Sequence, residues 1–263
     1  MKTKSLIPST IFQALSFFVV CIAFCACTNT ERIITVNGVD LHYEESGTND
    51  GQAVLLLHGN GGSHHDLDSL NVQLAHAGYH VYAIDSRGQG ANEPLNEYHY
   101  ADMAGDVYQF CQALNISKPI IYGWSDGGIV AMVMEMNHPG TASIIAASGA
   151  NITVDGIVDD VKDGFLSDAS NPLIKMMMVE PNIKPSELSK IKCPVLVTAG
   201  KGDIIKEEHT RMIAESLPKS KLMILDGEDH GSYIHNSNKI GHILLDFLQH
   251  TETIETADSI AVN

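Results

Sequence analysis

Short apolar runs alternate with helical patterns along most of the chain. The apolar runs cover residues 53–59, 80–86, 119–125, 143–149, 194–200 and 221–227. Continuous runs of this kind predict strands that are buried on both faces, as in a parallel sheet. The helical patterns between and after them cover residues 101–114, 126–137, 206–216 and 237–250. This alternation predicts an α/β sandwich with right-handed crossovers.

The segment before the first apolar run has a different pattern. Residues 32–47 read RIITVNGVDLHYEESG, in which apolar and polar residues alternate around Asn37 and Gly38. An Asn-Gly pair between alternating runs is a strong signal for a β-hairpin. The two strands of this hairpin and the six apolar runs together predict a mostly parallel sheet of eight strands.

One interval is longer than an ordinary connection. Between Ala150 and Lys192 lie about forty residues rich in Asp, Asn, Pro and Gly, which predicts an excursion over the edge of the sheet. Its one short helical candidate is PLIKMMMVE, at residues 172–180. Met176 to Met178 there suit either an adaptable apolar lid or ordinary packing against the domain below.

The first 27 residues have the layout of a signal peptide. Two lysines precede the apolar run from Ile11 to Phe24, which ends in small residues. A membrane-spanning helix needs about 20 apolar residues, and this run is shorter. We therefore predict a signal peptide at residues 1–27, a mature domain at residues 28–263, and export from the cytoplasm.

Phe24 to Cys27 also resembles a bacterial lipobox, although Phe24 stands where an aliphatic residue is usual. The resemblance implies lipidation of Cys27, so the mature protein is expected in the periplasm or as a membrane-anchored lipoprotein. Palmitate labelling of the wild-type protein and of Cys27→Ser tests this hypothesis.

Composition narrows the class of protein. A chain of 263 residues with 44% apolar content can bury the core of one globular domain. Its 16 basic residues are dispersed among 32 acidic ones, which disfavours nucleic acid as a partner because phosphate binding needs a clustered basic face. Cys111 and Cys193 are expected to be free thiols. No cofactor is expected.

A serine stands between glycines where one predicted strand meets a helix. Gly123-Trp124-Ser125-Asp126-Gly127 fits G-x-S-x-G, and the tight turn of a nucleophile elbow leaves no room for side chains at either glycine. A plain strand-to-helix turn is the alternative. In this context the motif predicts that Ser125 is presented for chemistry.

A serine nucleophile needs a histidine base and an acid that orients the histidine. Among 13 histidines, His230 follows the last predicted strand, at the edge where open α/β sheets bind ligands, and His235 competes with it. Asp203 leaves the preceding strand at the same edge, although it also suits the N-cap of the next helix. Asp226 and Asp229 are less suitable acids because they are too near His230 in sequence.

An oxyanion needs two preorganised N–H donors. The backbone N–H of Asp126 starts a predicted helix, and Asn60 in HGNGG supplies a second after the first parallel strand. His64 and His65 with Asp66 and Asp68 suggest a metal cluster, but adjacent residues point apart on a helix. We therefore predict no metal site.

Five segments together resemble the α/β-hydrolase fold serine enzymes. They are HGNGGS (58–63), DSRGQG (85–90), GWSDGG (123–128), AGKGD (199–203) and GEDH (227–230). The resemblance implies a three-layer sandwich with a small cap at about residues 151–190. It also implies a triad of Ser125, His230 and Asp203, with the N–H groups of Asn60 and Asp126 as oxyanion hole. Asn92 departs from the serine that usually ends the second segment.

Serine at position 125 disfavours the dehalogenases and epoxide hydrolases of this fold. We therefore expect hydrolysis of a small-molecule carboxylic ester through an acyl-enzyme. Cleavage of a C–C bond, an amide or peptide, or a lactone uses the same triad and stays open. A non-catalytic small-molecule sensor on a hydrolase scaffold is the alternative from another class. The oligomeric state is left open.

The elbow GWSDGG resembles that of valacyclovir hydrolase and its relatives, where an acidic pocket suits amino-acid esters. This resemblance implies a preference for a cationic acyl group. The alternative is that Asp126 only complements the dipole at the start of a helix, with its side chain turned away from the substrate.

Overall fold

A single sheet organises the chain. The computed structural model describes residues 30–168 and 170–261, the last ten by their backbone alone. Its eight strands lie in the order β1-β2-β4-β3-β5-β6-β7-β8. The strand bounds are β1 (Thr30–Val36), β2 (Val39–Gly47), β3 (Ala53–Leu57), β4 (His80–Ile84), β5 (Ile120–Trp124), β6 (Ile144–Ser148), β7 (Val195–Gly202) and β8 (Ser220–Asp229). The predicted fold class, with a mostly parallel sheet of eight strands, is confirmed.

The predicted hairpin forms one end of the sheet. Asn37 and Gly38 both have positive φ, at 48° and 77°, and close a turn between the paired residues Val36 and Val39. β2 pairs antiparallel with β1 and with β4, whereas every pairing from β4 to β8 is parallel. β1 therefore runs in the same direction as the parallel strands.

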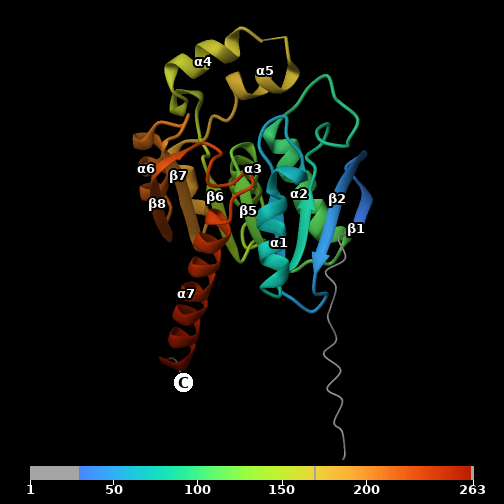
Figure 1. Ribbon diagram of the computed structural model, residues 1–263, viewed down its shortest axis with the longest axis vertical. Coiled ribbons are helices and arrows are strands. Elements are labelled where there is room, and N and C mark those ends of the chain that lie inside the picture. Colours follow the sequence, from blue (N-terminus) through green and yellow to red (C-terminus); the bar gives the residue numbers. More distant parts are fainter. Residues whose placement is uncertain (1–29, 169, 262–263) are drawn as a thin grey trace, which may run out of the picture.

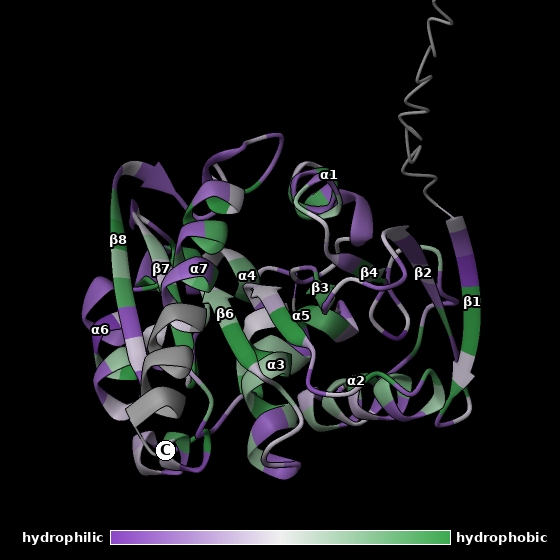
Figure 2. Cartoon of the chain, turned by 90° about the horizontal axis from the view of Figure 1, so that it is seen from below, coloured by the Kyte–Doolittle hydropathy of each residue, from purple (hydrophilic) through white to green (hydrophobic). Residues whose placement is uncertain are grey.

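Helices cover both faces of the sheet, as Figures 1 and 2 show. The main helices are α1 (Asp68–His76), α2 (Tyr100–Ala113), α3 (Asp126–Asn137), α6 (Glu207–Ser216) and α7 (Lys239–Ala261). Alternate residues of one strand enter separate cores: Leu55 and Leu57 pack with α2 and α3, and Val54 and Leu56 pack with α1 and α7. Both faces of the strands are thus apolar, which explains their continuous apolar runs.

The segment between β6 and β7 leaves the sheet and lies over the carboxyl ends of the parallel strands (Figure 1). It contains the helices α4 (Asp159–Leu166) and α5 (Pro172–Val179), and short 3₁₀ turns at Val154–Gly156 and Pro185–Lys190. The helical candidate at residues 172–180 corresponds to α5. We refer to residues 151–190 as the cap segment.

Two helical assignments differ from the prediction by more than a shift of one residue. His64 and His65, placed in a helical pattern by sequence, lie in a 3₁₀ turn (His64–Leu67) just before α1. The sequence predicts that the last helix ends at His250, whereas it continues to Ala261, and no proline or glycine stands between these two residues.

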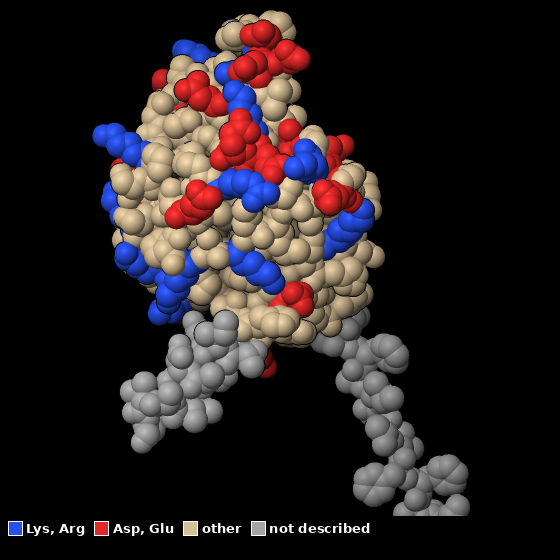
Figure 3. All heavy atoms as spheres, turned by 90° about the vertical axis from the view of Figure 1, so that its left-hand side faces the viewer, with Lys and Arg blue, Asp and Glu red and all other residues tan. Residues whose placement is uncertain are grey.

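The surface over α6 and β8 carries acidic and basic side chains side by side (Figure 3). Ion pairs on this part of the chain include Arg211 with Glu207 and Lys206 with Asp159. Within the described residues no helix is both long and apolar enough to span a membrane. Cys111 and Cys193 are free thiols, as predicted, and burial raises the pKa of each to about 12.

Candidate active site

Ser125 occupies a strained turn between β5 and α3. Its backbone has φ 53° and ψ −116°, and its N–H donates to the carbonyl of Ser148 at 2.7 Å. A Cβ at Gly123 would lie 2.2 Å from the carbonyl carbon and oxygen of Gly127, and one at Gly127 would lie 2.1 Å from the carbonyl oxygen of Leu57. Both glycines are therefore required by backbone contact, as a nucleophile elbow demands.

His230 and Asp203 meet at the carboxyl edge of the sheet. Nδ1 of His230 donates to Oδ1 of Asp203 at 2.6 Å, and the Asp203 carboxylate is 1% exposed. The same carboxylate accepts the backbone N–H of Ile205 at 3.0 Å and that of Gly200 at 3.3 Å. Asp203 is thus held by its own turn, and the N-cap of α6 is Lys206. This arrangement leaves Nε2 of His230 as the ring nitrogen that can accept a proton.

The competing residues have other contacts. His235 packs edge-on against Trp124, with ring centroids 4.3 Å apart, and Nε1 of Trp124 donates to the carbonyl of His230 at 2.9 Å. Trp124 therefore supports the loop that carries His230. Asp229 accepts the N–H groups of the two residues after His230, and Asp226 is exposed. None of these residues contacts the His230 ring nitrogen that Asp203 holds.

Asn60 and Asp126 supply backbone N–H groups beside Ser125. Neither N–H has a hydrogen-bond acceptor among the described residues. The loop that carries Asn60 is fixed by its neighbours, since the N–H of Gly61 donates to Oε1 of Gln89 at 2.7 Å. The two N–H groups are thus available to an oxyanion.

The His58 side chain connects the loop that carries Asn60 to the loop that begins at Ser86. Its Nδ1 donates to the carbonyl of Gly59 at 2.7 Å, and its Nε2 accepts the N–H of Ser86 at 3.0 Å. Burial lowers the pKa of His58, which keeps the ring neutral, as its acceptor role requires. Asn92 is the residue that departs from the family motif. Its side-chain amide closes the loop after β4 by donating to the carbonyls of Asp85 and Ser86.

The carboxylate of Asp126 is buried beneath the site, with 4% of the residue exposed. Oδ1 accepts the hydroxyl of Tyr100 at 2.7 Å, and Oδ2 accepts the side-chain amide of Asn60 at 2.9 Å. Burial raises the pKa of Asp126, and these two hydrogen bonds oppose the rise. The sequence carries no signal for this contact, because Tyr100 lies 26 positions away at the start of another helix.

A cavity of about 260 Å³ joins the site to the cap segment. Ser125, His230, Asn60 and Gly59 form its floor, and the other lining residues are Trp124, Phe165, Ile174, Met177 and Ile204. Phe165 comes from α4, and Ile174 and Met177 come from α5. The cavity is therefore apolar apart from the candidate catalytic groups, and the Asp126 carboxylate is outside its lining.

One group of described side chains has the spacing of metal ligands, namely Glu31, His64 and His65. His64 is buried, and its ring nitrogens lie 2.8 Å from Oδ1 of Asp85 and 3.2 Å from Oε1 of Glu31. Burial alone would lower the pKa of His64, but the hydrogen bond to Asp85 and the nearby carboxylates raise it to about 9. A protonated imidazole between two carboxylates forms an ion-pair network, and a metal ion would have to displace its proton.

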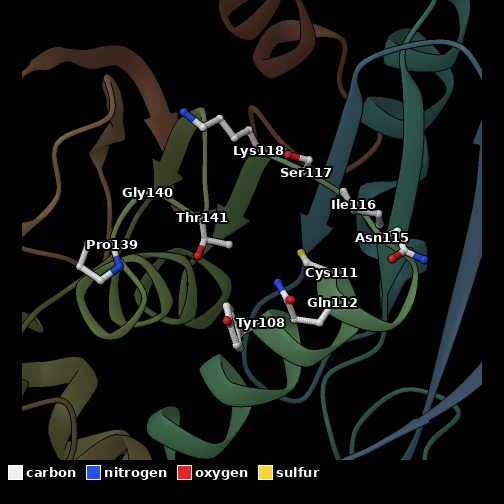
Figure 4. Close-up of a pocket in the computed structure, with 10 residues that line it drawn as sticks. All are labelled: Tyr108, Cys111, Gln112, Asn115, Ile116, Ser117, Lys118, Pro139, Gly140 and Thr141. Carbon is white, nitrogen blue, oxygen red and sulfur yellow. The ribbon is translucent and has the colours of Figure 1, made fainter.

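A second hollow lies at the opposite edge of the sheet (Figure 4). It measures about 420 Å³ and is formed by the end of α2, the segment before β5 and the turn after α3. Its lining includes Tyr108, Lys118 and Thr141, and none of the predicted site residues reaches it. Of those residues, Cys27 lies outside the described part of the chain.

Residues 52–176 match the family model described as alpha/beta hydrolase fold. Serine hydrolase BPHL of Homo sapiens is 28% identical over 259 residues, covering 84% of this chain and 87% of that protein. Among solved structures, Est816, an N-acyl homoserine lactone degrading enzyme, has a TM-score of 0.73 at 20% identity and is covered completely by 82% of this chain. CarC, a serine hydrolase involved in carbazole degradation, has a TM-score of 0.70 at 24% identity, with 84% of this chain and 99% of CarC covered.

The strand order, the elbow at Ser125 and these similarities all indicate the same fold. The chain has the α/β-hydrolase fold. The similar proteins are themselves described as serine hydrolases or as a lactone-degrading enzyme.

Proposed function

We propose that the protein is a serine hydrolase that cleaves a small-molecule carboxylic ester with an uncharged acyl group. One observation carries the proposal: Ser125 stands on a strained elbow and lines the same apolar cavity as His230, whose other ring nitrogen is held by Asp203. The similarity to a protein named serine hydrolase supports serine as the nucleophile.

In the proposed reaction, Oγ of Ser125 attacks the ester carbonyl carbon while Nε2 of His230 accepts the hydroxyl proton. The N–H groups of Asn60 and Asp126 stabilise the oxyanion. The C–O bond to the alcohol then breaks, and the alcohol leaves with the proton from His230. Water repeats these steps on the acyl-enzyme, which releases the acid and restores Ser125.

The acyl group is inferred from the cavity. Its lining residues beyond the catalytic groups are apolar, so burial of an apolar acyl chain is favourable. A cationic amine would need a carboxylate in the cavity. Asp126 does not suit this role because both of its oxygens already accept hydrogen bonds, from Tyr100 and Asn60. The cavity thus favours uncharged acyl groups over amino-acid esters.

A direct test compares the purified domain with Ser125→Ala on p-nitrophenyl esters of increasing chain length. Ser186→Ala, at an exposed serine of the cap segment, is the matched control. We expect Ser125→Ala to lose on the order of a millionfold in kcat and the control to keep wild-type activity. Alanyl and propionyl esters in the same panel test charge, and we expect the propionyl ester to react faster.

The outcomes separate the candidate functions. Equal activity of the wild-type protein and Ser125→Ala would exclude Ser125 as the nucleophile. A wild-type protein that opens lactones faster than it cleaves open-chain esters would assign lactone hydrolysis, and the similar Est816 is an N-acyl homoserine lactone degrading enzyme. Inert protein that binds a small molecule and captures a partner only in its presence would support the sensor function.

We further propose export of this hydrolase, with Cys27 as the lipidation site. The support comes from the apolar run after two lysines and from the lipobox-like Phe24 to Cys27. Fractionation of cells that express wild-type protein and Cys27→Ser tests the proposal. Lipidation predicts wild-type protein in the membrane fraction and Cys27→Ser outside it.

A further inference from the structure

A chain of hydrogen bonds links the cap segment to the loop that carries Asn60. Glu180 follows α5, and its Oε2 accepts the backbone N–H of Tyr100, the first residue of α2, at 3.1 Å. Its Oε1 lies 2.7 Å from Nδ1 of His99, the N-cap of the same helix. Glu180 therefore fixes the start of α2, where an acidic side chain also complements the helix dipole.

The chain continues through two buried side chains. Tyr100 is 2% exposed and donates its hydroxyl to Asp126 at 2.7 Å, and Asp126 accepts the side-chain amide of Asn60 at 2.9 Å. A buried carboxylate that loses one of its donors loses a large part of its compensation for desolvation. Removal of the Tyr100 hydroxyl should therefore disturb Asp126 first and Asn60 next.

Asn60 and Asp126 also carry the backbone N–H groups beside Ser125 that find no acceptor among the described residues. Donors of an oxyanion hole act only when they are held close to the position where charge develops. The side-chain contact between these residues joins the loop that carries Asn60 to the first residue of α3. Neither Tyr100 nor Glu180 lines the cavity, so neither is placed to bind substrate.

On the basis of the hydrolase function proposed above, we propose that Tyr100 and the Asp126 side chain are positioning residues for the oxyanion hole, and that Glu180 couples their position to the cap segment. The hydroxyl of Tyr100 holds the Asp126 carboxylate, and the carboxylate holds Asn60. Displacement of the cap segment at Glu180 then loosens the oxyanion hole, so that closure of the cap over a substrate and readiness for catalysis are linked.

Tyr100→Phe tests the positioning role, and Tyr98→Phe is its matched control. Tyr98 is 5% exposed in the same segment, but its hydroxyl forms hydrogen bonds with the backbone of Leu95 and Gly88. Loss of one whole oxyanion donor costs about 10²–10³ in kcat, so we expect a misplaced donor in Tyr100→Phe to cost about tenfold. KM should stay unchanged, and Tyr98→Phe should keep wild-type kcat.

Glu180→Ala tests the coupling to the cap segment and changes a partly exposed side chain, so the domain should fold. We expect kcat to fall several-fold in the same direction, again without a change in KM. Glu97→Ala, at a 77% exposed carboxylate that is also near His99, is the control. A rise in KM with unchanged kcat in either test variant would mean that the cap segment only shapes the cavity, and it would overturn the proposal.

A readout that does not depend on turnover separates this proposal from the hydrolase function. The backbone amide resonance of Asn60 in a ¹⁵N–¹H spectrum should shift in Tyr100→Phe and Glu180→Ala and stay in place in both controls. If the wild-type protein cleaves no ester but the resonance shifts in this way, the hydrolase proposal fails and the link to Asn60 stands. If esters are cleaved and neither the resonance nor kcat changes, the positioning proposal fails alone.

Discussion

Nδ1 of His230 lies 2.6 Å from Oδ1 of Asp203, although 27 positions separate the two residues along the chain. Asp203 leaves β7 and His230 follows β8, and these parallel strands pair with each other, so their carboxyl ends bring the two side chains together. The carboxylate fixes the tautomer in which Nε2 of His230 can take a proton.

Asp203→Asn should reduce kcat by about 10⁴, because an amide in place of the carboxylate favours the wrong tautomer of His230. Steady-state kinetics on the best ester of the series measures the loss. Asp229→Asn is the control, because Asp229 precedes His230 but its carboxylate accepts hydrogen bonds from the backbone of Gly231 and Ser232. If Asp229→Asn lost as much activity as Asp203→Asn, the orienting acid would be misassigned.

Gly127→Ala should destabilise the domain by about 3 kcal/mol or more, because the new Cβ would lie 2.1 Å from the carbonyl oxygen of Leu57 and backbone would have to move. Gly164→Ala is a matched change in α4, where a Cβ meets nothing within 4 Å. This control should gain up to about 1 kcal/mol. Urea unfolding of the three proteins measures both effects, and equal stabilities would contradict the elbow geometry.

The His64 ion pair should make stability fall as the pH rises. Its pKa of about 9 in the folded protein exceeds the usual 6.5, so its stabilisation is complete below pH 6.5 and is lost as the pH rises through 9. The loss in free energy of unfolding should reach roughly 3 kcal/mol. His64→Gln should remove this slope, whereas His65→Gln, at a ring that is 63% exposed, should keep it.

His209 should make the stability of the domain fall as the pH decreases. Its Nε2 accepts the N–H of Ile152 at the start of the cap segment, and burial lowers the pKa of its ring. Stabilisation by a lowered histidine pKa is present above the unfolded pKa and is lost as the pH falls through 6.5. Unfolding measured from pH 7 to pH 5 should therefore show a decline that His209→Gln reduces. His250→Gln, at a ring that is 69% exposed, should follow the wild-type curve.

Phe165→Ala should enlarge the acyl part of the cavity and shift activity toward longer acyl chains. The ratio of kcat/KM for a long ester to that for a short one should rise about tenfold, since a methylene or two in an apolar pocket carries that much discrimination. Leu166→Ala changes the next residue, which is 56% exposed and outside the cavity. Its chain-length profile should match that of the wild-type protein.

The elbow could be predicted from the sequence because its signal is local. An apolar run, two glycines and a helical pattern define the turn around Ser125. Asp203 and His230 could be placed at the same edge because each follows a predicted parallel strand. Parallel strands end at the same edge of a sheet, so the direction of the two strands is enough to place Asp203 and His230 near each other.

Side-chain networks between distant segments could not be predicted in this way. Asp126 had two candidate roles, amine binding and helix-dipole complementation, and its contacts with Tyr100 and Asn60 add a third. Glu180 and His99 lie 81 positions apart. Their contact depends on where the cap segment crosses the start of α2, and periodicity does not report this crossing.

The direction of β1 has a practical consequence. Thr30, the first residue of β1, lies at the edge of the sheet opposite to the cavity. The reason is that β1 runs in the same direction as the parallel strands, whose carboxyl ends carry Ser125 and His230. A bead, chip or fusion partner joined ahead of Thr30 is therefore attached on the side remote from the cavity mouth. Immobilisation through this end leaves the cavity facing the solution, so the proposed activity can be assayed on a support.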